Sequence, residues 1–360
     1  MQRWIDFLKQ QGASDIDAET LAIGRFGTAP AAATAATDFM TPLTDSGLIA
    51  AAGADAPTFL HNQLTNDVEH LGQTQARLAG YCTPKGRLLA SFLVWKSHDE
   101  ILLQLPRNLQ PAIQKRLQMF IMRAKATLTD LAPLHVQLGL AGPAAAGVLP
   151  NWFASLPDAP YGKVDSAAGT LIRLADTGHT GSTTANGIPR YLWITAAQTL
   201  EDAWPLLAGV LQPAGAAAWA LAGIRAGVPE ITGATQEKFV PQMINFEAVG
   251  GVNFQKGCYP GQEIVARSQY LGKLKRRMQP ATVAAAAAAG MEVFSEDDPE
   301  QACGMVVNAA AIDAGSSACL VEIKLGALAF PVHIGSSTGP LLTFQALPYA
   351  LADAERPDLR

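Results

Sequence analysis

Apolar positions along this chain follow two periods, one helical and one alternating. Apolar residues recur at helical spacing in a few segments, which we expect to be helices: 3–10, 55–64, 109–120, 142–149, 200–211 and 263–270. Short apolar or alternating runs bounded by turn residues predict strands: 44–52, 76–82, 87–95, 101–105, 126–130, 135–140 and 191–195. Strands mixed with single helices indicate an α+β fold rather than a doubly wound parallel sheet.

After Gly272 the pattern changes, and mainly short strand-like pieces remain. These pieces are 275–282, 291–294, 303–308, 318–323 and 331–334. Short strands separated by frequent turns favour a small β-barrel. We expect residues 29–37, which are rich in alanine and threonine, to be a loose surface segment, and residues 350–360 to be a frayed polar tail.

One uncharged stretch, residues 203–224, is long enough to raise the question of a membrane span. It contains Pro205, several glycines and the turn sequence Gln212-Pro213-Ala214-Gly215. Two short buried helices joined by that turn are the better interpretation. The first nine residues carry Asp6 and no long apolar core, so we do not expect a signal peptide.

The composition is that of a globular chain with ample material for a core. The 360 residues suggest two or three domains, with 49% hydrophobic and 16% charged side chains. A net charge of −5 argues against a large nucleic-acid footprint but leaves room for a local one. The four cysteines lie far apart without zinc-binding spacing, which fits neither a metal site nor a disulfide framework and favours a reducing cytoplasm.

The segment Lys256-Gly257-Cys258-Tyr259-Pro260-Gly261-Gln262-Glu263 places a cysteine in a tight turn directly before a predicted helix. A nearby cation and a helix N-terminus both favour the reactive thiolate, although Glu263 partly opposes the second effect. The alternative is a buried structural cysteine, because cysteine is among the most buried residue types. The polar, glycine-flanked neighbours favour exposure, so Cys258 and Lys256 are the candidate catalytic residues.

The longer run KGCYPGQEIVAR, from Lys256 to Arg267, resembles the signature of the YgfZ family. These are folate-binding proteins associated with maintaining iron–sulfur enzymes, and they share their fold with the glycine cleavage T-protein, an aminomethyltransferase. The resemblance adds supporting motif residues to Cys258 and Lys256: Gly257, Tyr259, Gly261, Gln262, Glu263 and Arg267. Weaker similarities to T-protein-like domains lie at 53–67, 140–144 and 223–229.

The resemblance implies a T-protein-like arrangement of two α+β domains and a small C-terminal β-barrel around a central opening that holds tetrahydrofolate. We place the first domain at residues 1–133, completed by 225–272, which carry the cysteine motif. The second domain then covers 134–224, the barrel 273–349 and the tail 350–360.

Residues for the folate are also implied by the resemblance. Arg225 lies in the stretch that carries a folate-contacting arginine, and its fork geometry suits the glutamate carboxylates of folate, with a surface ion pair as the alternative. Asp67, with Asn66 beside it, is suited to hydrogen-bond a pterin ring or to end a helix. Lys85 is a further candidate, but a lysine in a hairpin turn is ordinarily solvated. Arg190 resembles an arginine common in the family, and its role stays open.

The chain departs from the T-protein pattern where that enzyme keeps its chemistry. Residues 44–47 read Thr-Asp-Ser-Gly in place of Ser-His-Met-Gly, and the strand at 85–92 has no carboxylate where the catalytic aspartate belongs. Residues 178–181 only faintly resemble the Gly-Tyr-Thr-Gly-Glu element and favour a flexible loop. Because activating an aminomethyl group needs a placed acid or base, we do not expect an aminomethyltransferase.

Four basic residues follow the cysteine helix: Lys273, Lys275, Arg276 and Arg277. They could contact tRNA or polyglutamyl folate, or could be a solvated barrel edge, where lysine is common. A cysteine hydrolase would need a histidine within reach of the thiol, and the six histidines cannot be placed by sequence.

The sequence therefore favours a tetrahydrofolate-binding accessory protein for iron–sulfur enzymes or their assembly factors, including enzymes that modify tRNA. Cys258 would carry the chemistry. The alternatives are a folate-dependent one-carbon transferase and a tRNA-binding module.

Overall fold

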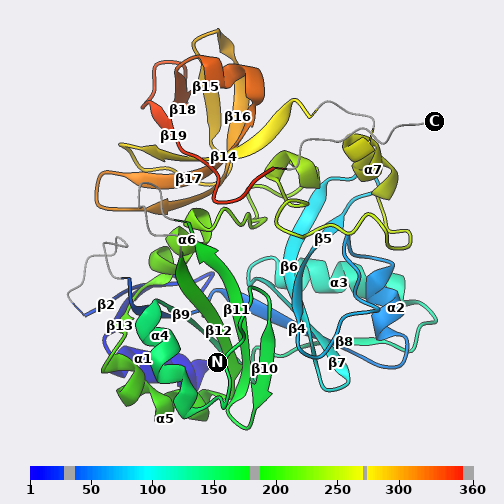
Figure 1. Cartoon of the computed structure of the whole chain (residues 1–360), viewed down its shortest axis with the longest axis vertical. Coiled ribbons are helices and arrows are strands. Elements are labelled where there is room, and N and C mark those ends of the chain that lie inside the picture. Colours follow the sequence, from blue (N-terminus) through cyan, green and yellow to red (C-terminus); the bar gives the residue numbers. More distant parts are fainter. Residues whose placement is uncertain (28–36, 179–186, 271–273, 352–360) are drawn as a thin grey trace.

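The computed structural model describes residues 1–27, 37–178, 187–270 and 274–351. The expected loose segment 29–37 and the expected tail 350–360 fall almost wholly outside these ranges. Lys273 and most of the segment 178–181 also lie outside them. Figure 1 shows the arrangement: a β-barrel lies above two α+β units that stand side by side.

A six-stranded sheet forms the centre of one α+β unit. In spatial order its strands are β10 (Lys163–Ser166), β11 (Gly169–Thr177), β12 (Ile188–Thr195), β9 (Val136–Ala141), β3 (Phe39–Pro42) and β13 (Gln212–Pro213). The helices of this unit are α1 (Gln2–Gln10), α4 (Pro143–Val148), α5 (Ala197–Ala208) and α6 (Ala216–Arg225), with the short helix η1 (Leu149–Asn151) after α4. Strands β1 (Ala13–Ile16) and β2 (Ile23–Phe26) form a small hairpin beside them.

The beginning of the chain belongs with this sheet rather than with the first predicted domain. Strand β3 pairs with β9 and β13. Trp4 of α1 is fully buried, and its ring lies 6.0 Å from that of Trp204 in α5. The boundary drawn at residues 1–133 therefore differs from the structure over roughly the first 43 residues, because sheet pairing and aromatic packing join segments that are far apart in sequence.

The other α+β unit is built on an antiparallel five-stranded sheet. In spatial order its strands are β5 (Ala76–Cys82), β6 (Leu88–Ser97), β7 (Glu100–Pro106), β4 (Ser46–Ala52) and β8 (Thr127–Asp130). Helices α2 (Ala56–His61) and α3 (Gln110–Ile121) pack their apolar side chains into the same core. The expected hairpin between β5 and β6 forms, with Gly86 at φ +70° in its turn.

Six strands make the C-terminal barrel. Their spatial order is β18 (Val332–Ile334), β15 (Glu292–Ser295), β16 (Asp298–Ala311), β17 (Ser317–Lys324), β14 (Arg276–Val283) and β19 (Leu342–Phe344), and η3 (Leu325–Ala329) follows β17. A single bridge between His333 and Leu341 links the two edges of the sheet. The barrel is therefore nearly closed, which removes most of the exposed strand edge.

The segment from 226 to 270 runs between all three parts. It contains η2 (Pro241–Ile244) and α7 (Gln262–Tyr270). Phe239 accepts a backbone hydrogen bond from Leu88 of β6 at 2.9 Å, and Phe246 and Val265 share a buried cluster with Met278 of the barrel. This segment therefore joins the five-stranded unit to the barrel.

The uncharged stretch 203–224 forms the end of α5, the short strand β13 and most of α6, as the turn residues predict. Across the described ranges, no helix combines the length and apolar character needed to cross a membrane.

Candidate functional site

Cys258 lies in the turn immediately before α7, and its side chain is exposed. Cys82, Cys303 and Cys319 are all buried, and the four thiols are free. Burial raises the pKa of the Cys82 and Cys319 thiols to about 12. Cys258 is thus the thiol that a reagent or partner can reach.

Gly261 fixes the position of this turn. It has φ +83°, and a Cβ at this position would lie 2.4 Å from the carbonyl oxygen of Thr83 and 2.7 Å from Gly86 Cα. Glycine therefore allows both the left-handed backbone and the close approach to the β5–β6 turn. Behind it, Val265 of α7 is fully buried, and its carbonyl oxygen accepts a hydrogen bond from Gln242 at 2.8 Å.

Lys256 is buried, and its side chain points into the protein. Its Nζ donates to the carbonyl oxygens of His61 and Leu64, the latter at 2.9 Å, and lies 4.7 Å from the ring centroid of Tyr259. Burial lowers the pKa of Lys256 to about 8, although the charges of Asp67 and Cys258 oppose the shift. Lys256 therefore fixes the Cys258 turn to the end of α2 by hydrogen bonds, and it places a positive charge near the thiol.

The other motif residues divide by burial. Tyr259 is 7% exposed, whereas Glu263 and Arg267 are exposed on α7. Gln262 begins α7, and its backbone N–H donates to the Tyr259 carbonyl at 3.1 Å.

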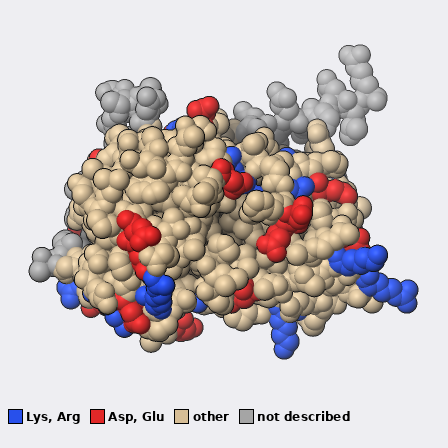
Figure 2. Space-filling model, turned by 90° about the horizontal axis from the view of Figure 1, so that it is seen from below, with Lys and Arg blue, Asp and Glu red and all other residues tan. Residues whose placement is uncertain are grey.

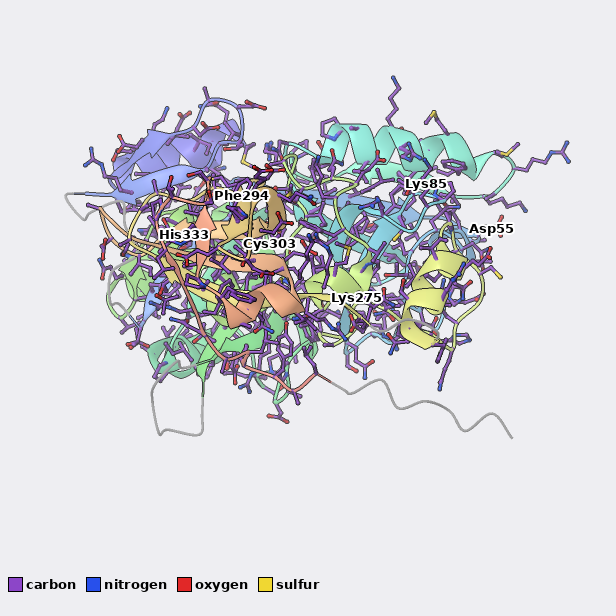
Figure 3. The ribbon with its side chains drawn as sticks, turned by 90° about the horizontal axis from the view of Figure 1, so that it is seen from above. Asp55, Lys85, Lys275, Phe294, Cys303 and His333 are labelled. Carbon is purple, nitrogen blue, oxygen red and sulfur yellow. The ribbon has the colours of Figure 1, made fainter. Side chains whose placement is uncertain are left out.

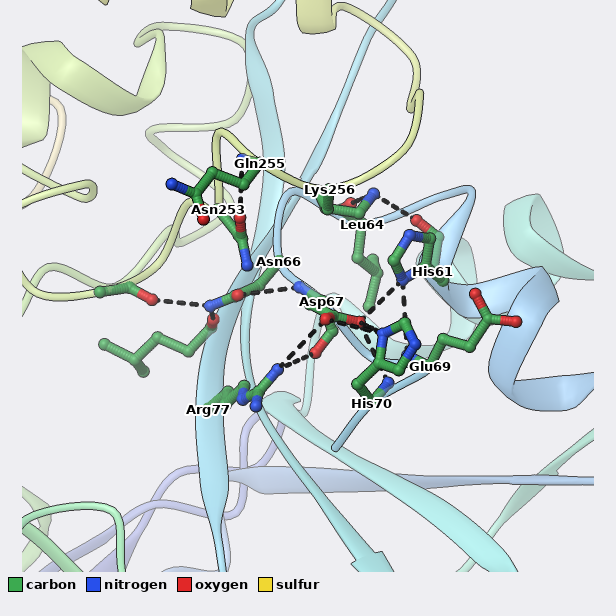
Figure 4. A network of polar contacts seen from close by, with 12 residues as sticks. His61, Leu64, Asn66, Asp67, Glu69, His70, Arg77, Asn253, Gln255 and Lys256 are labelled. Atoms are coloured by element: carbon green, nitrogen blue, oxygen red, sulfur yellow. Dashed lines mark hydrogen bonds and ion pairs between the residues drawn. The ribbon is translucent and has the colours of Figure 1, made fainter. Parts of the chain in front are cut away.

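A polar network centred on Asp67 lies beside Lys256 (Figure 4). Asp67 contacts two histidines: its carboxylate lies 3.0 Å from His61 Nδ1 and 3.0 Å from His70 Nδ1. Burial opposes ionisation of Asp67, but hydrogen bonds from His70 and the charges of His70 and His61 outweigh it and lower the pKa of the carboxyl. Asn66 donates both amide hydrogens to the carbonyls of Leu78 and Gly250 at 2.7 Å, so its donors are committed to the fold.

A cavity of about 290 Å³ lies between the two sheets, α6 and the barrel. Its polar side chains include Gln104, Tyr161, Arg190 and Glu230, and Phe92 and Trp219 contribute aromatic surface. A concave, largely apolar site with a few convergent polar groups is typical of small-molecule binding.

Arg190 is poised for a partner in this cavity. It is 5% exposed, its guanidinium carbon lies 4.4 Å from the ring centroid of Trp219, and no described residue accepts a hydrogen bond from its Nε. Burial lowers the pKa of Arg190 to about 10, so it stays charged at neutral pH. A buried guanidinium with an unused donor favours an anionic or acceptor-bearing ligand.

Glu230 brings a carboxyl to the same cavity. Asn308 of β16 holds its backbone, accepting from the Glu230 N–H at 3.0 Å and donating to its carbonyl at 2.9 Å. Glu230 is exposed to solvent where it opens onto the cavity, yet the many protein atoms near its carboxyl still displace part of the surrounding water. This desolvation, together with the charge of Asp45, raises the pKa of Glu230 to about 7.

The four residues predicted to bind folate do not gather around one cavity. Arg225 borders a neighbouring pocket of about 660 Å³ at the barrel, and Asn66 and Asp67 border a polar depression of about 590 Å³. Lys85 is exposed at the tip of the β5–β6 hairpin (Figure 3). The sequence did not identify Glu230 and Trp219 as residues of the cavity. The one sequence signal for Glu230 is its position directly after the T-protein-like stretch 223–229.

Ion pairs occupy part of the basic cluster. Both Arg276–Glu322 contacts measure 2.9 Å, and Arg277 pairs with Glu247, whereas Lys275 is exposed. Figure 2 shows one face of the molecule, on which acidic and basic side chains are interspersed. Contact with a polyanion through this cluster stays a prediction. Among the described residues, no group of three or more histidine, cysteine or carboxylate side chains is arranged to hold a metal ion.

No protein-family model matches the chain. A Klebsiella pneumoniae protein named tRNA-modifying protein YgfZ is 30% identical over 318 residues, which cover 87% of this chain and 93% of that protein. The protein of the same name from Sodalis glossinidius is 30% identical over 320 residues, 86% of this chain and 93% of the relative.

Among solved structures, the glycine cleavage system aminomethyltransferase T from Bartonella henselae superposes with a TM-score of 0.75 over 96% of both chains, at 16% sequence identity. This likeness concerns the fold alone. It confirms the expected α+β, T-protein-like architecture.

Proposed function

The chain belongs to the YgfZ family, and from that premise we propose that it is a tetrahydrofolate-binding accessory protein that supports iron–sulfur enzymes through Cys258. The name of its relatives, tRNA-modifying protein YgfZ, supports clients that include enzymes of tRNA modification. The observation that carries the proposal is the contrast among the thiols: Cys258 is exposed on a fixed turn, and the other three are buried.

A complementation experiment tests the role of the thiol. Cells that lack their own copy of the gene receive the wild-type chain or Cys258→Ala, and the level of a tRNA nucleoside made by an iron–sulfur enzyme is measured by mass spectrometry. We expect Cys258→Ala to lose most of the support while the protein stays folded, because the exposed side chain contributes little to packing. Cys303→Ala, which removes a buried thiol from the barrel, is the matched control. Full support by Cys258→Ala would contradict the proposal.

For the folate, the central cavity is the better site than the positions inferred from sequence. Aromatic walls, the unused Arg190 donor and the Glu230 carboxyl suit a flat, polar ring such as a pterin. Ile224 borders both this cavity and the pocket of Arg225. A ligand with its ring in the cavity could therefore extend its glutamate tail toward Arg225, as the resemblance implies.

Two ligands and two variants test the pterin end and the glutamate end of folate separately. Tetrahydrofolate and a tetrahydropterin without the p-aminobenzoylglutamate tail are titrated against the wild-type chain, Arg190→Gln and Arg225→Gln. We expect Arg190→Gln to weaken both ligands by about tenfold or more, the loss of one charge-assisted hydrogen bond. Arg225→Gln should weaken tetrahydrofolate alone. If Arg190→Gln binds both ligands with unchanged affinity, folate does not bind in the central cavity.

Glu230 favours one alternative, a folate-dependent one-carbon transferase. A carboxyl with a pKa of about 7 can act as acid or base at neutral pH, and it lies in the cavity although the strand at 85–92 has no carboxylate. The test is turnover of tetrahydrofolate with a methylamine donor. Activity that Glu230→Gln abolishes would establish the enzyme, and no turnover by the wild-type chain would exclude it for that donor.

A further inference from the structure

His61 lies at the end of α2, directly under the turn that carries Cys258. Its ring is buried, with 7% of the residue exposed. An ideal Cβ built on Gly257 would lie 3.5 Å from His61 Nε2, so this nitrogen is within contact distance of the residue that precedes Cys258. No local sequence pattern indicates that α2 and the cysteine motif meet, since they are far apart in the chain.

The hydrogen bonds of the ring define which nitrogen is available. Nδ1 lies 3.0 Å from the Asp67 carboxylate, and the Glu69 N–H approaches the same atom at 3.5 Å, a weak contact. Because the pKa of Asp67 is lowered, its carboxylate is charged and favours a proton on Nδ1. Nε2 then carries the lone pair, and it is the nitrogen that faces Gly257.

Lys256 holds the two parts together. Its Nζ donates to the carbonyl oxygen of His61 itself and to that of Leu64. The residue two positions before the thiol is therefore fixed to the backbone of the histidine. The charged or titratable groups around the ring are Asp67, Glu69, His70 and Lys256, and Arg77 lies 3.9 Å from the Asp67 carboxylate (Figure 4).

We propose that the exposed Cys258 side chain turns toward His61 Nε2, which lies against the preceding Gly257, and that His61, oriented by Asp67, then accepts the thiol proton, so that the two form a thiolate–imidazolium pair. The S–H bond breaks, the proton moves to Nε2, and the electron pair stays on Sγ. Asp67 stabilises the new positive charge through Nδ1–H, and the Lys256 ammonium favours the negative sulfur. No oxidant or second reactant is needed. The inference rests on the proposed role of Cys258 and supplies the base that this role requires.

The test is the rate at which iodoacetamide alkylates Cys258 as a function of pH, followed by mass spectrometry of its peptide. A thiolate held by an imidazolium reacts well below the pH at which an ordinary thiol ionises. We expect His61→Gln to slow the reaction by about tenfold or more near pH 7 and to shift the profile toward that of a free cysteine. Asp67→Asn keeps the shape of the side chain, removes its charge and should shift the profile in the same direction.

His70→Gln is the matched control, because it removes the exposed histidine from the same carboxylate. It should change the rate by less than about threefold. Circular dichroism and thermal unfolding verify that each variant is folded. A pH profile of Asp67→Asn and His61→Gln that coincides with that of the wild-type chain would overturn the proposal.

The readout involves neither folate nor tRNA, so the two ideas can fail separately. If alkylation is unchanged in the His61 variant but Cys258→Ala loses complementation, His61 is not the base and the proposed function of Cys258 stands. If alkylation of the His61 variant is slowed but Cys258→Ala complements fully, His61 is the base and the proposed function of Cys258 is wrong.

Discussion

The surroundings of Glu230 change the chemistry of a single side chain. The Glu230 side chain is exposed where it opens onto the cavity, yet desolvation by the surrounding protein and the charge of the nearby Asp45 raise its pKa from 4.5 to about 7. Burial also raises the pKa of Asp45, and the Asp45 charge adds to the rise at Glu230. Perturbed carboxyls in a cavity are candidates for function, and this one is placed by the backbone hydrogen bonds of Asn308.

The stability of the chain should record this shift. Between about pH 4.5, the unfolded value, and about pH 7, the folded protein binds more protons at Glu230 than the unfolded chain, so its contribution to the free energy of unfolding falls as pH rises. Glu230→Gln carries no charge and should remove that decline. We expect its melting temperature to exceed that of the wild-type chain by a few degrees near pH 8. Solvent in the cavity screens the Glu230 charge and keeps this difference small. The difference should shrink toward pH 5. A difference independent of pH would contradict the shifted pKa.

At the scale of elements, the position of Cys258 depends on how α7 meets the β5–β6 hairpin. Gly261 and Gly86 both have positive φ, and the two turns contact each other at their backbones. Side chains at this contact would push the helix start away from the hairpin. The turn that holds Cys258 is therefore fixed by backbone packing rather than by its own hydrogen bonds alone.

Gly261→Ala tests this contact, and Gly250→Ala is its control. Gly250 has φ +79°, close to the +83° of Gly261, but nothing lies within 4 Å of a Cβ built there. Gly250→Ala should cost about 1 kcal/mol in free energy of unfolding, the strain of the left-handed backbone. Gly261→Ala adds the collision with Thr83 and Gly86 and should cost about 2–4 kcal/mol. Urea unfolding measures both, and equal losses would contradict the packing argument.

At the scale of the whole molecule, the segment after α6 holds the barrel against the five-stranded unit. Arg277 of β14 donates to the Gln242 carbonyl at 3.0 Å and pairs with the Glu247 carboxylate. The Asn245 side chain bonds both backbone groups of Met278, at 2.8 Å and 3.3 Å. The Arg277 and Glu247 side chains are only 8% and 10% exposed, so this ion pair lies within the junction.

Arg277→Met should therefore lower the free energy of unfolding by about 3 kcal/mol, because it leaves Glu247 buried without its partner. Lys275→Met changes an exposed neighbour on the same side of the barrel and should stay within about 0.5 kcal/mol of the wild-type value. The double variant Arg277→Met with Glu247→Leu should recover much of the loss, since it removes both charges. Chemical unfolding measures all three. Equal stability of the two single variants would contradict a stabilising role of the Arg277–Glu247 pair at the junction.

Local signals made much of the fold predictable. The β5–β6 hairpin, α3, the barrel strands and the exposed cysteine before α7 all follow from turn residues and apolar period, which act over a few neighbouring positions. The same signals could not assign α1 and β3 to the unit of the six-stranded sheet. That assignment depends on pairing between β3, β9 and β13, which no local pattern encodes.

By itself the sequence determined the α+β class, the barrel and the family, and it predicted that Cys258 is exposed. Only the tertiary structure decided which side chains share a site. It placed Arg190, Trp219 and Glu230 around one cavity and separated Arg225, Asp67 and Lys85 from it. It also brought His61 beneath the Cys258 turn. The reason is physical: a site is made by the burial and packing of segments distant in the chain, and its electrostatics depend on distances that exist only after the chain has folded.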